Sequence, residues 1–225
     1  PTVKTTIQEQ FNRCAPYYLK DSAMADQKLL HWIVQLSEPQ ANDRTLDVAC
    51  GAGFLVHEFA KFVCHAIGVD LSKTMLREAR KYALELGLAN SSFKLAHAES
   101  LPFADEAFNI VSCKLALHYF TDPQRTIREM NRVAKSGARL ILIDRVSSED
   151  QCKREYHNRI EKLRTPSKIK VYSTSEITDL MKGQGLSILH THYYEQQQDF
   201  EEWIKTTGFW LGRFLQANRQ VCRFF

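Results

Sequence analysis

The stretch Leu46-Asp47-Val48-Ala49-Cys50-Gly51-Ala52-Gly53 (46–53) joins a short apolar run to a helical pattern, and it decides the fold. A turn rich in glycine lets the backbone approach a ligand closely because glycine has no Cβ. The start of the next helix offers free N–H groups to an anionic ligand. The stretch therefore predicts a nucleotide-like ligand at the carboxyl end of a first strand. The alternative is a tight strand-to-helix turn with no ligand.

Short apolar runs alternate with amphipathic stretches on both sides of this turn. Expected strands cover Thr45–Ala49, His65–Val69, Ser92–Ala96, Asn109–Cys113 and Ala138–Ile143, with helices between them at about 54–62, 72–86 and 123–134. A sixth strand is expected at Leu186–Tyr194. This order predicts an α/β fold: a doubly wound, Rossmann-like, mainly parallel sheet of six to seven strands with helices on both faces.

Local signals support several helix ends. Ser72 is a candidate N-cap and Gly87 a candidate stop for one helix, and Asp122-Pro123 supplies a cap followed by proline at the first helical position. Ser173-Thr174-Ser175-Glu176 has the form of a capping box. The helix that it opens is expected to stop near Gly183 and Gly185.

Composition sets broad limits on the class of protein. The chain has 225 residues, 44% hydrophobic and 25% charged, with a formal net charge of +4, which gives no reason to expect a nucleic-acid partner. No apolar run is long enough to span a membrane, and the start lacks the plan of a secretory signal, so a cytoplasmic location is expected. The six cysteines form no C-x-x-C pair and are expected to be reduced thiols.

No metal site is expected. His190 and His192 fall on one face of the expected sixth strand, but no third ligand accompanies them.

An acidic residue narrows the ligand to an adenosine compound. Asp70 ends the second expected strand 70 − 51 = 19 residues beyond Gly51, the position that pairs with ribose hydroxyls in dinucleotide folds. A nicotinamide site would favour a third glycine three residues after Gly53, where the chain has Val56. A pyrophosphate is therefore not expected, and no P-loop motif occurs in the chain.

Four motifs together resemble class I S-adenosylmethionine-dependent methyltransferases. They are D-x-A-x-G-x-G at 47–53, G-V-D at 68–70, A-E-S-L-P-F at 98–103, and A-L-H-Y-F after the fourth expected strand. Within this class the chain looks like the methyltransferase-11 group, which includes quinone-biosynthesis C-methyltransferases and the biotin-pathway enzyme that methylates malonyl on its carrier protein. The likeness runs from about Phe11 to Arg145 and weakens beyond it.

The resemblance implies S-adenosylmethionine as methyl donor, with S-adenosylhomocysteine as product. It places Gly51 and Gly53 at the methionine part, Asp70 at the ribose diol and Met75 on the adenine. The full expected donor set is Asp47, Ala49, Gly51, Gly53, Asp70, Leu71, Met75, His97, Ala98, Glu99 and Lys114. Two of these depart from the family: Ala49 stands where many members have glycine, and His97 stands where aspartate often accepts a hydrogen bond from adenine.

The length predicts one domain over 1–225. Periodicity predicts helices at 3–14 and 24–36, so residues 1–40 are expected to form N-terminal cap helices and 44–146 the donor-binding core. Residues 147–225 are expected to form a lid or substrate region with a C-terminal strand and a helix that begins near Asp199. Family members close the sheet with a seventh, antiparallel strand, for which the sequence after the expected sixth strand and last helix leaves little room.

The predicted reaction is an in-line displacement, for which positioning and exclusion of water supply most of the effect. His118, just after the fourth strand, is a candidate base, with Tyr18 and Tyr119 bordering the acceptor pocket. A packed or capping role is the alternative for His118. The acceptor is expected to be a small molecule or a carrier-bound group, and the oligomeric state is open.

Segment 151–170 carries seven basic and two acidic residues. This charge suits either a site for an acidic acceptor or a solvated amphipathic helix. Two other functions stay open: a non-catalytic donor-binding partner subunit, and an RNA or protein methyltransferase. The second lacks support because no N/D-P-P-[YF] motif follows the fourth strand.

Overall fold

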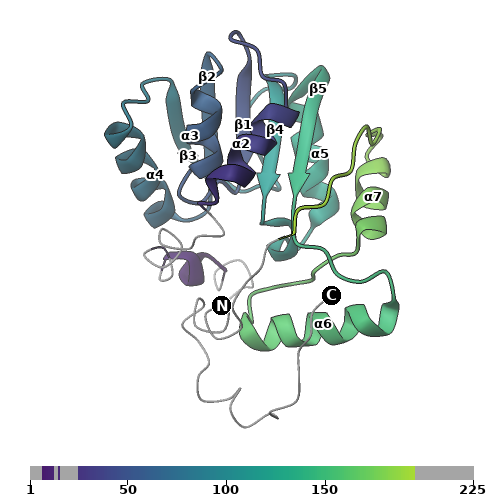
Figure 1. Cartoon of the computed structure of the whole chain (residues 1–225). Helices are drawn as coiled ribbons and strands as arrows, with labels where there is room; N and C mark the ends of the chain where they lie inside the picture. The colour runs from purple at the N-terminus through teal and green to yellow at the C-terminus, as the bar shows by residue number, and fades with distance from the viewer. Residues whose placement is uncertain (1–6, 13–14, 16–24, 196–225) are drawn as a thin grey trace.

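A computed structural model describes residues 7–12, 15 and 25–195 (Figure 1). Its strands are β1 (Arg44–Val48), β2 (His65–Asp70), β3 (Ser91–Leu95), β4 (Phe108–Lys114) and β5 (Ala134–Ile143). Its helices are α2 (Gln27–Leu36), α3 (Phe54–Ala60), α4 (Lys73–Glu85), α5 (Pro123–Val133), α6 (Gln151–Arg164) and α7 (Thr174–Lys182), with a 3-10 turn η1 (Leu117–Tyr119).

The five strands form one parallel sheet in the order β3-β2-β1-β4-β5. The order reverses at β1, because β2 and β3 extend to one side of it and β4 and β5 to the other. In the central register Asp47 lies beside Gly68 on β2 and Ser112 on β4. The predicted Rossmann-like parallel sheet is confirmed. Its reversal point is where open α/β sheets bind ligands beyond the carboxyl ends of the strands.

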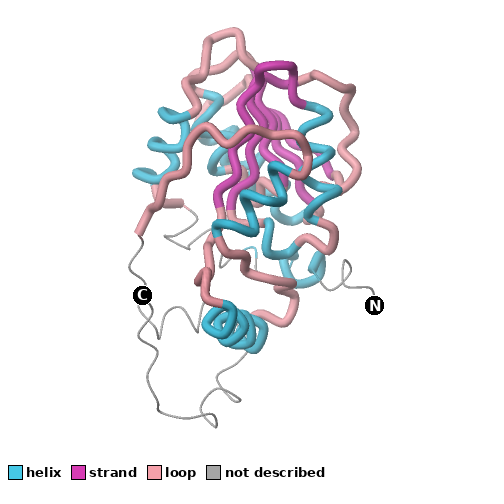
Figure 2. The backbone as a smooth tube through the Cα atoms, turned by 90° about the vertical axis from the view of Figure 1, so that its right-hand side faces the viewer, coloured by secondary structure: helices cyan, strands magenta, loops and turns pink. Residues whose placement is uncertain are grey.

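Two apolar cores cover the two faces of this sheet. One joins α2, α3 and α4 to sheet residues such as Ala66, and the other joins α5 to sheet residues such as Ile67. Neighbouring strand residues serve opposite cores because side chains alternate across a strand. Figure 2 shows the sheet between its helical layers. This explains why the inner strands β1, β2 and β4 are mostly buried along their length.

The predicted helix ends are present. The Ser72 hydroxyl accepts from the Met75 N–H at the start of α4, Gly87 follows its end with φ of +68°, and Asp122 caps α5 ahead of Pro123. Ser173 and Glu176 form the reciprocal capping box of α7, which ends at Gly183.

The expected sixth strand is wrong: residues 186–194 are described, and they form no strand. No backbone hydrogen bond joins them to β5 within the described ranges. Their side chains contact the N-terminal part of the core instead. The Tyr194 hydroxyl donates to Asp26 at 2.9 Å, and its ring lies 6.0 Å from the Trp32 ring. The described sheet therefore has five strands, not six to seven.

Some expected elements fall on residues that the structure does not describe. Residues 7–12 are helical, but the flanks of the expected 3–14 helix lie outside the described residues. The same holds for the expected helix near Asp199 and for any seventh strand. The expected 24–36 helix is present as α2. No helix in the described part of the chain is long and apolar enough to cross a membrane.

Helix α6 lies beyond the carboxyl ends of the strands, below the arrowheads in Figure 1. Its Asn158 side chain exchanges hydrogen bonds with backbone atoms of Val171, and the Ile169 N–H donates to the His118 carbonyl oxygen at 2.8 Å. The α6 region is thereby held against the turn that follows β4.

Candidate functional site

The loop from Ala49 to Gly53 turns sharply between β1 and α3. Ala49, Gly51 and Gly53 all have left-handed backbone, with φ of +59°, +54° and +79°. The Cys50 N–H donates to the Val69 carbonyl on β2 at 2.9 Å, which ties the loop to the neighbouring strand. An added Cβ at Gly51 would meet nothing within 4 Å, so the backbone there faces open space.

Gly53 serves a different purpose from Gly51. It is the N-cap of α3, and an added Cβ would lie 2.7 Å from a ring atom of Phe93. Gly53 is not among the residues that line the pocket described below. In this structure it provides the close approach of helix to sheet.

Asp70, at the end of β2, holds the loop in place. One carboxylate oxygen accepts from the Gly51 N–H at 2.9 Å and the other from the Ser72 N–H at 2.8 Å. Burial raises the pKa of this carboxyl, and the backbone donors partly oppose that effect. Each oxygen keeps a further lone pair, so the carboxylate can still accept from a ligand.

Asp47, near the end of β1, is buried at 3% exposure. It accepts a hydrogen bond from the Ser112 hydroxyl at 2.7 Å. Burial raises its pKa to about 7; the Ser112 hydrogen bond and the positive charge of Lys114 lower it, and the charge of Asp70 raises it further. Two carboxyls thus approach the pocket at the centre of the sheet, where a positively charged ligand would favour their ionised forms.

The carboxyl ends of β2 and β3 supply a mixed apolar and polar wall. Met75 is buried, and His97 is exposed and forms an isolated bridge with Ser100. The Glu99 carboxylate accepts from the Thr121 hydroxyl at 2.8 Å.

The buried His118 lines another part of the pocket wall, and the buried Asp144 holds its ring. Nδ1 of His118 lies 2.6 Å from Oδ1 of Asp144, and the two side chains are 5% and 2% exposed. Asp144 directly follows β5, and its other oxygen accepts from the His118 N–H at 3.3 Å. When Nδ1 carries the proton, the carboxylate fixes the ring and leaves Nε2 as the acceptor.

One pocket joins these groups. It is lined by ten of the eleven expected donor residues, all except Gly53, and also by His118 and Tyr119. Tyr18 lies outside the described residues. Among the described residues no group of three or more His, Cys, Asp or Glu side chains could hold a metal ion.

Several lining residues lie outside the expected donor set. Ile7 and Phe11 come from the N-terminal helical segment, and Arg145, Arg164 and Lys168 come from the region after β5. Asp144, which holds His118, could have been found by the rule that located Asp70, since it also follows a parallel strand. Arg164 and Lys168 belong to the basic segment 151–170, for which the sequence left open a site for an acidic acceptor or a solvated helix. The charge pattern did not indicate which of its basic side chains line the pocket.

Comparison with known proteins is consistent with this geometry. A family model described as a methyltransferase domain matches residues 39–208. The chain is 32% identical over 203 residues to the uncharacterized methyltransferase YcgJ of Bacillus subtilis, covering 90% of this chain and 80% of YcgJ. The YcgJ crystal structure superposes with a TM-score of 0.80 at 34% identity, covering 83% of this chain and 80% of that one.

Two further similarities are more distant. The ubiquinone/menaquinone biosynthesis C-methyltransferase UbiE of Pseudomonas putida is 36% identical over 115 residues, 49% of this chain and 45% of UbiE. A SAM-dependent methyltransferase from Aquifex aeolicus shares the fold, with a TM-score of 0.57 at 22% identity over 69% of this chain and 78% of that one.

Proposed function

This chain belongs to the S-adenosylmethionine-dependent methyltransferases, and we propose that it transfers a methyl group to a small-molecule or carrier-bound acceptor by in-line displacement. The observation that carries the proposal is that one pocket is lined by Gly51 and Asp70 and also by His118, whose ring Asp144 holds. One side of this pocket suits the donor, and the other offers a candidate base.

The residues present fit the donor. The open space at Gly51 admits a ligand against the backbone, and Asp70 can accept hydrogen bonds from a ribose diol. Leu71, Met75 and Ala98 give an apolar surface for adenine, while Asp47 and Lys114 suit the charged methionine end. When bound, S-adenosylmethionine supplies a methyl group already activated on a sulfonium.

The acceptor side then needs two things from the protein: orientation and removal of a proton. A pocket shielded from water favours methyl transfer over side reactions. Nε2 of His118, with Nδ1 held by Asp144, can accept a proton from an acceptor hydroxyl, amine or activated carbon.

Isothermal titration calorimetry with S-adenosylmethionine and S-adenosylhomocysteine tests the donor site. We expect both to bind. Failure of both to bind would contradict the proposal. Turnover on a panel of acceptors, measured as release of S-adenosylhomocysteine, then distinguishes an enzyme from a donor-binding partner subunit. RNA and protein acceptors in the same panel test the alternative of an RNA or protein methyltransferase.

Replacing Asp144 with asparagine tests the base. We expect Asp144→Asn to lower kcat by about 10²-fold or more, because an amide holds the wrong imidazole tautomer and does not stabilise its protonated form. The affinity for S-adenosylhomocysteine should change less than twofold. An unchanged kcat and pH profile would assign the pair a packing role only.

A further inference from the structure

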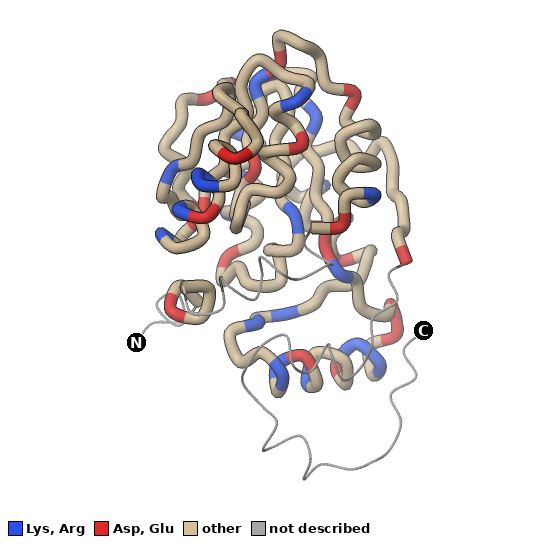
Figure 3. Tube along the Cα trace, turned by 60° about the vertical axis from the view of Figure 1, so that its left-hand side comes forward, with Lys and Arg blue, Asp and Glu red and all other residues tan. Residues whose placement is uncertain are grey.

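Three basic side chains line the pocket on the side of the His118 and Asp144 pair. Arg145 directly follows Asp144, whereas Arg164 and Lys168 come from the end of α6 and the segment after it. Arg164 is 6% exposed and Lys168 is 4% exposed. Figure 3 shows basic positions along α6 and along the segment that follows it. Buried cations that face a pocket are costly to maintain unless a partner or a ligand compensates them.

Arg164 and Lys168 share a carboxylate partner, Glu161, which does not line the pocket. Nζ of Lys168 and Nη2 of Arg164 both contact the same oxygen of Glu161, the latter at 3.2 Å. Glu161 is 3% exposed and does not line the pocket. Glu161 therefore anchors the two cations from behind, while the surface that they present to the pocket is basic.

The electrostatics of Lys168 fit a site that accepts negative charge. Burial lowers its pKa to about 8; Glu161 opposes this, and the positive charges of Arg164 and Arg145 lower it further. An anion placed among these three groups would favour the charged ammonium.

The basic group lies across the sheet from the expected adenine end. β3 ends two residues before His97 and β5 ends two residues before Arg145, and these two strands are the opposite edges of the sheet. Four strand spacings separate these edges, roughly 19 Å. The backbone bond from Ile169 to His118 holds the basic segment beside the candidate base instead.

We propose that Arg145, Arg164 and Lys168 bind an oxyanion of the methyl acceptor, a carboxylate or a phosphate, and orient the acceptor beside His118. The inference rests on the proposed function, because it assigns the chemical class of the molecule that the same pocket methylates. Guanidinium groups match the two oxygens of such an anion, and the ammonium adds a point charge.

The test uses small probes on the protein saturated with S-adenosylhomocysteine. Phenyl phosphate and benzoate distinguish the two oxyanions, and phenol is the uncharged control. We expect at least one anion to bind tenfold or more tightly than phenol. Equal binding of all three would overturn the inference. Absence of S-adenosylhomocysteine binding would instead count against the proposed function.

Variants then locate the anion. Lys168→Met and Arg145→Gln should each weaken the preferred anion about tenfold and change S-adenosylhomocysteine affinity less than twofold. The control Lys162→Gln makes the same charge change at an exposed position of α6 and should have no effect.

Two results would overturn the assignment. A tenfold loss of S-adenosylhomocysteine affinity in Lys168→Met and Arg145→Gln would assign the cations to the carboxylate of the donor. Equal anion affinity in these variants and in Lys162→Gln would show that the anion binds elsewhere. Melting temperatures, with and without the anion, confirm that each variant is folded. Arg145 is only half-buried, so Arg145→Gln provides the test if Lys168→Met does not fold.

Discussion

At the scale of the residue, Gly51 and Gly53 share a left-handed backbone but differ in their surroundings. A Cβ at Gly51 would enter open pocket space, whereas a Cβ at Gly53 would overlap the Phe93 ring. We expect Gly51→Ala to cost about 1 kcal/mol of unfolding free energy and to weaken S-adenosylmethionine binding tenfold or more. Gly53→Ala should cost about 2 to 4 kcal/mol, from backbone strain and overpacking together.

Urea unfolding and calorimetric titration measure both quantities for each variant. Gly87→Ala is a suitable control, because Gly87 also has positive φ, with nothing within 4 Å of an added Cβ, but lies at the end of α4 away from the pocket lining. Stability losses of equal size at Gly51 and Gly53 would contradict the distinction.

The same two glycines show what the sequence could predict at this scale. The motif predicted that the loop and Asp70 lie at one edge of the sheet, and they do, because the ends of adjacent parallel strands share one edge. The motif did not show that a Cβ would have space at Gly51 but not at Gly53, because the contact at Gly53 comes from Phe93, forty residues away in sequence. The bond from Asp70 to the Gly51 N–H was likewise not foreseen.

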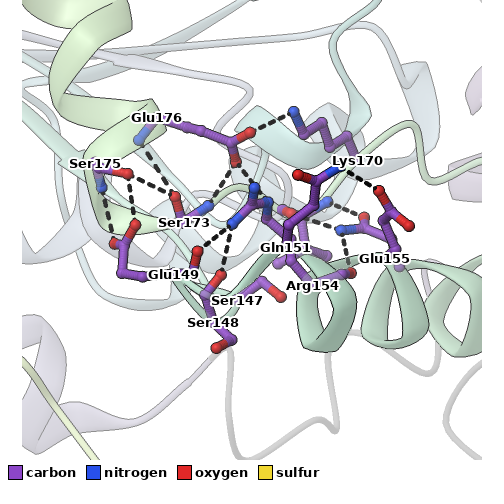
Figure 4. Close-up of polar contacts among 12 residues, drawn as sticks. Ser147, Ser148, Glu149, Gln151, Arg154, Glu155, Lys170, Ser173, Ser175 and Glu176 are labelled. Carbon is purple, nitrogen blue, oxygen red and sulfur yellow. Dashed lines mark hydrogen bonds and ion pairs between the residues drawn. The ribbon is translucent and has the colours of Figure 1, made fainter.

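At the scale of the element, α7 is held largely by polar contacts. None of its residues is buried. Glu176 accepts from Lys170 Nζ at 2.7 Å and from the Ser173 N–H at 2.9 Å, and Nε of Arg154 on α6 lies 3.6 Å from its carboxylate. Figure 4 shows these side chains together. One carboxylate therefore joins the first turn of α7 to α6 and to the segment that carries Lys168.

We expect Glu176→Gln to loosen this region without unfolding the sheet. Amide hydrogen exchange in residues 147–182 should accelerate about tenfold, the effect of losing somewhat more than 1 kcal/mol of local stability. Exchange in β1, β2 and β4 should not change. The control Glu155→Gln removes a carboxylate from the exposed face of α6, where it accepts a hydrogen bond from the Gln151 side chain at 2.8 Å. Matching exchange in both variants would contradict a special role for Glu176.

Elements with a strong local signal could be predicted, and those that depend on a distant partner could not. Alternating apolar runs and helix caps gave five strands and the helices between them to within a few residues. Residues 186–194 have a strand-like pattern, yet their aromatic side chains contact Trp32 and Asp26. A strand needs a neighbour in register, and sequence pattern alone does not supply one.

At the scale of the whole molecule, acidic side chains lie at the ends of the central strands, and basic side chains lie in the region that follows β5. Asp47 lies near the end of β1 and Asp70 ends β2. Arg145, Arg164 and Lys168 line the same pocket from the region after β5. This separation suits a cationic donor and an anionic acceptor that meet at His118. It also makes the stability of the protein depend on pH and on the donor.

The pKa of Asp47 gives the sign of that dependence. Burial raises it from 3.8 to about 7, so the native state keeps a proton between pH 4 and 7 that the unfolded chain releases. The unfolding free energy should therefore fall as pH rises through this window, by at most about 1.4 kcal/mol per pH unit. Burial raises the pKa of Asp70 as well, which acts in the same direction.

Urea unfolding between pH 5 and 8 measures this effect, with Asp47→Asn as the comparison. We expect the slope to be smaller in the variant, because an amide does not titrate. Saturating S-adenosylmethionine carries positive charge to these carboxyls and favours their ionised forms, so it should stabilise the wild type more at pH 8 than at pH 5. If wild type and Asp47→Asn show the same slope and the same pH dependence of donor stabilisation, Asp47 is not the group that links protonation to donor binding.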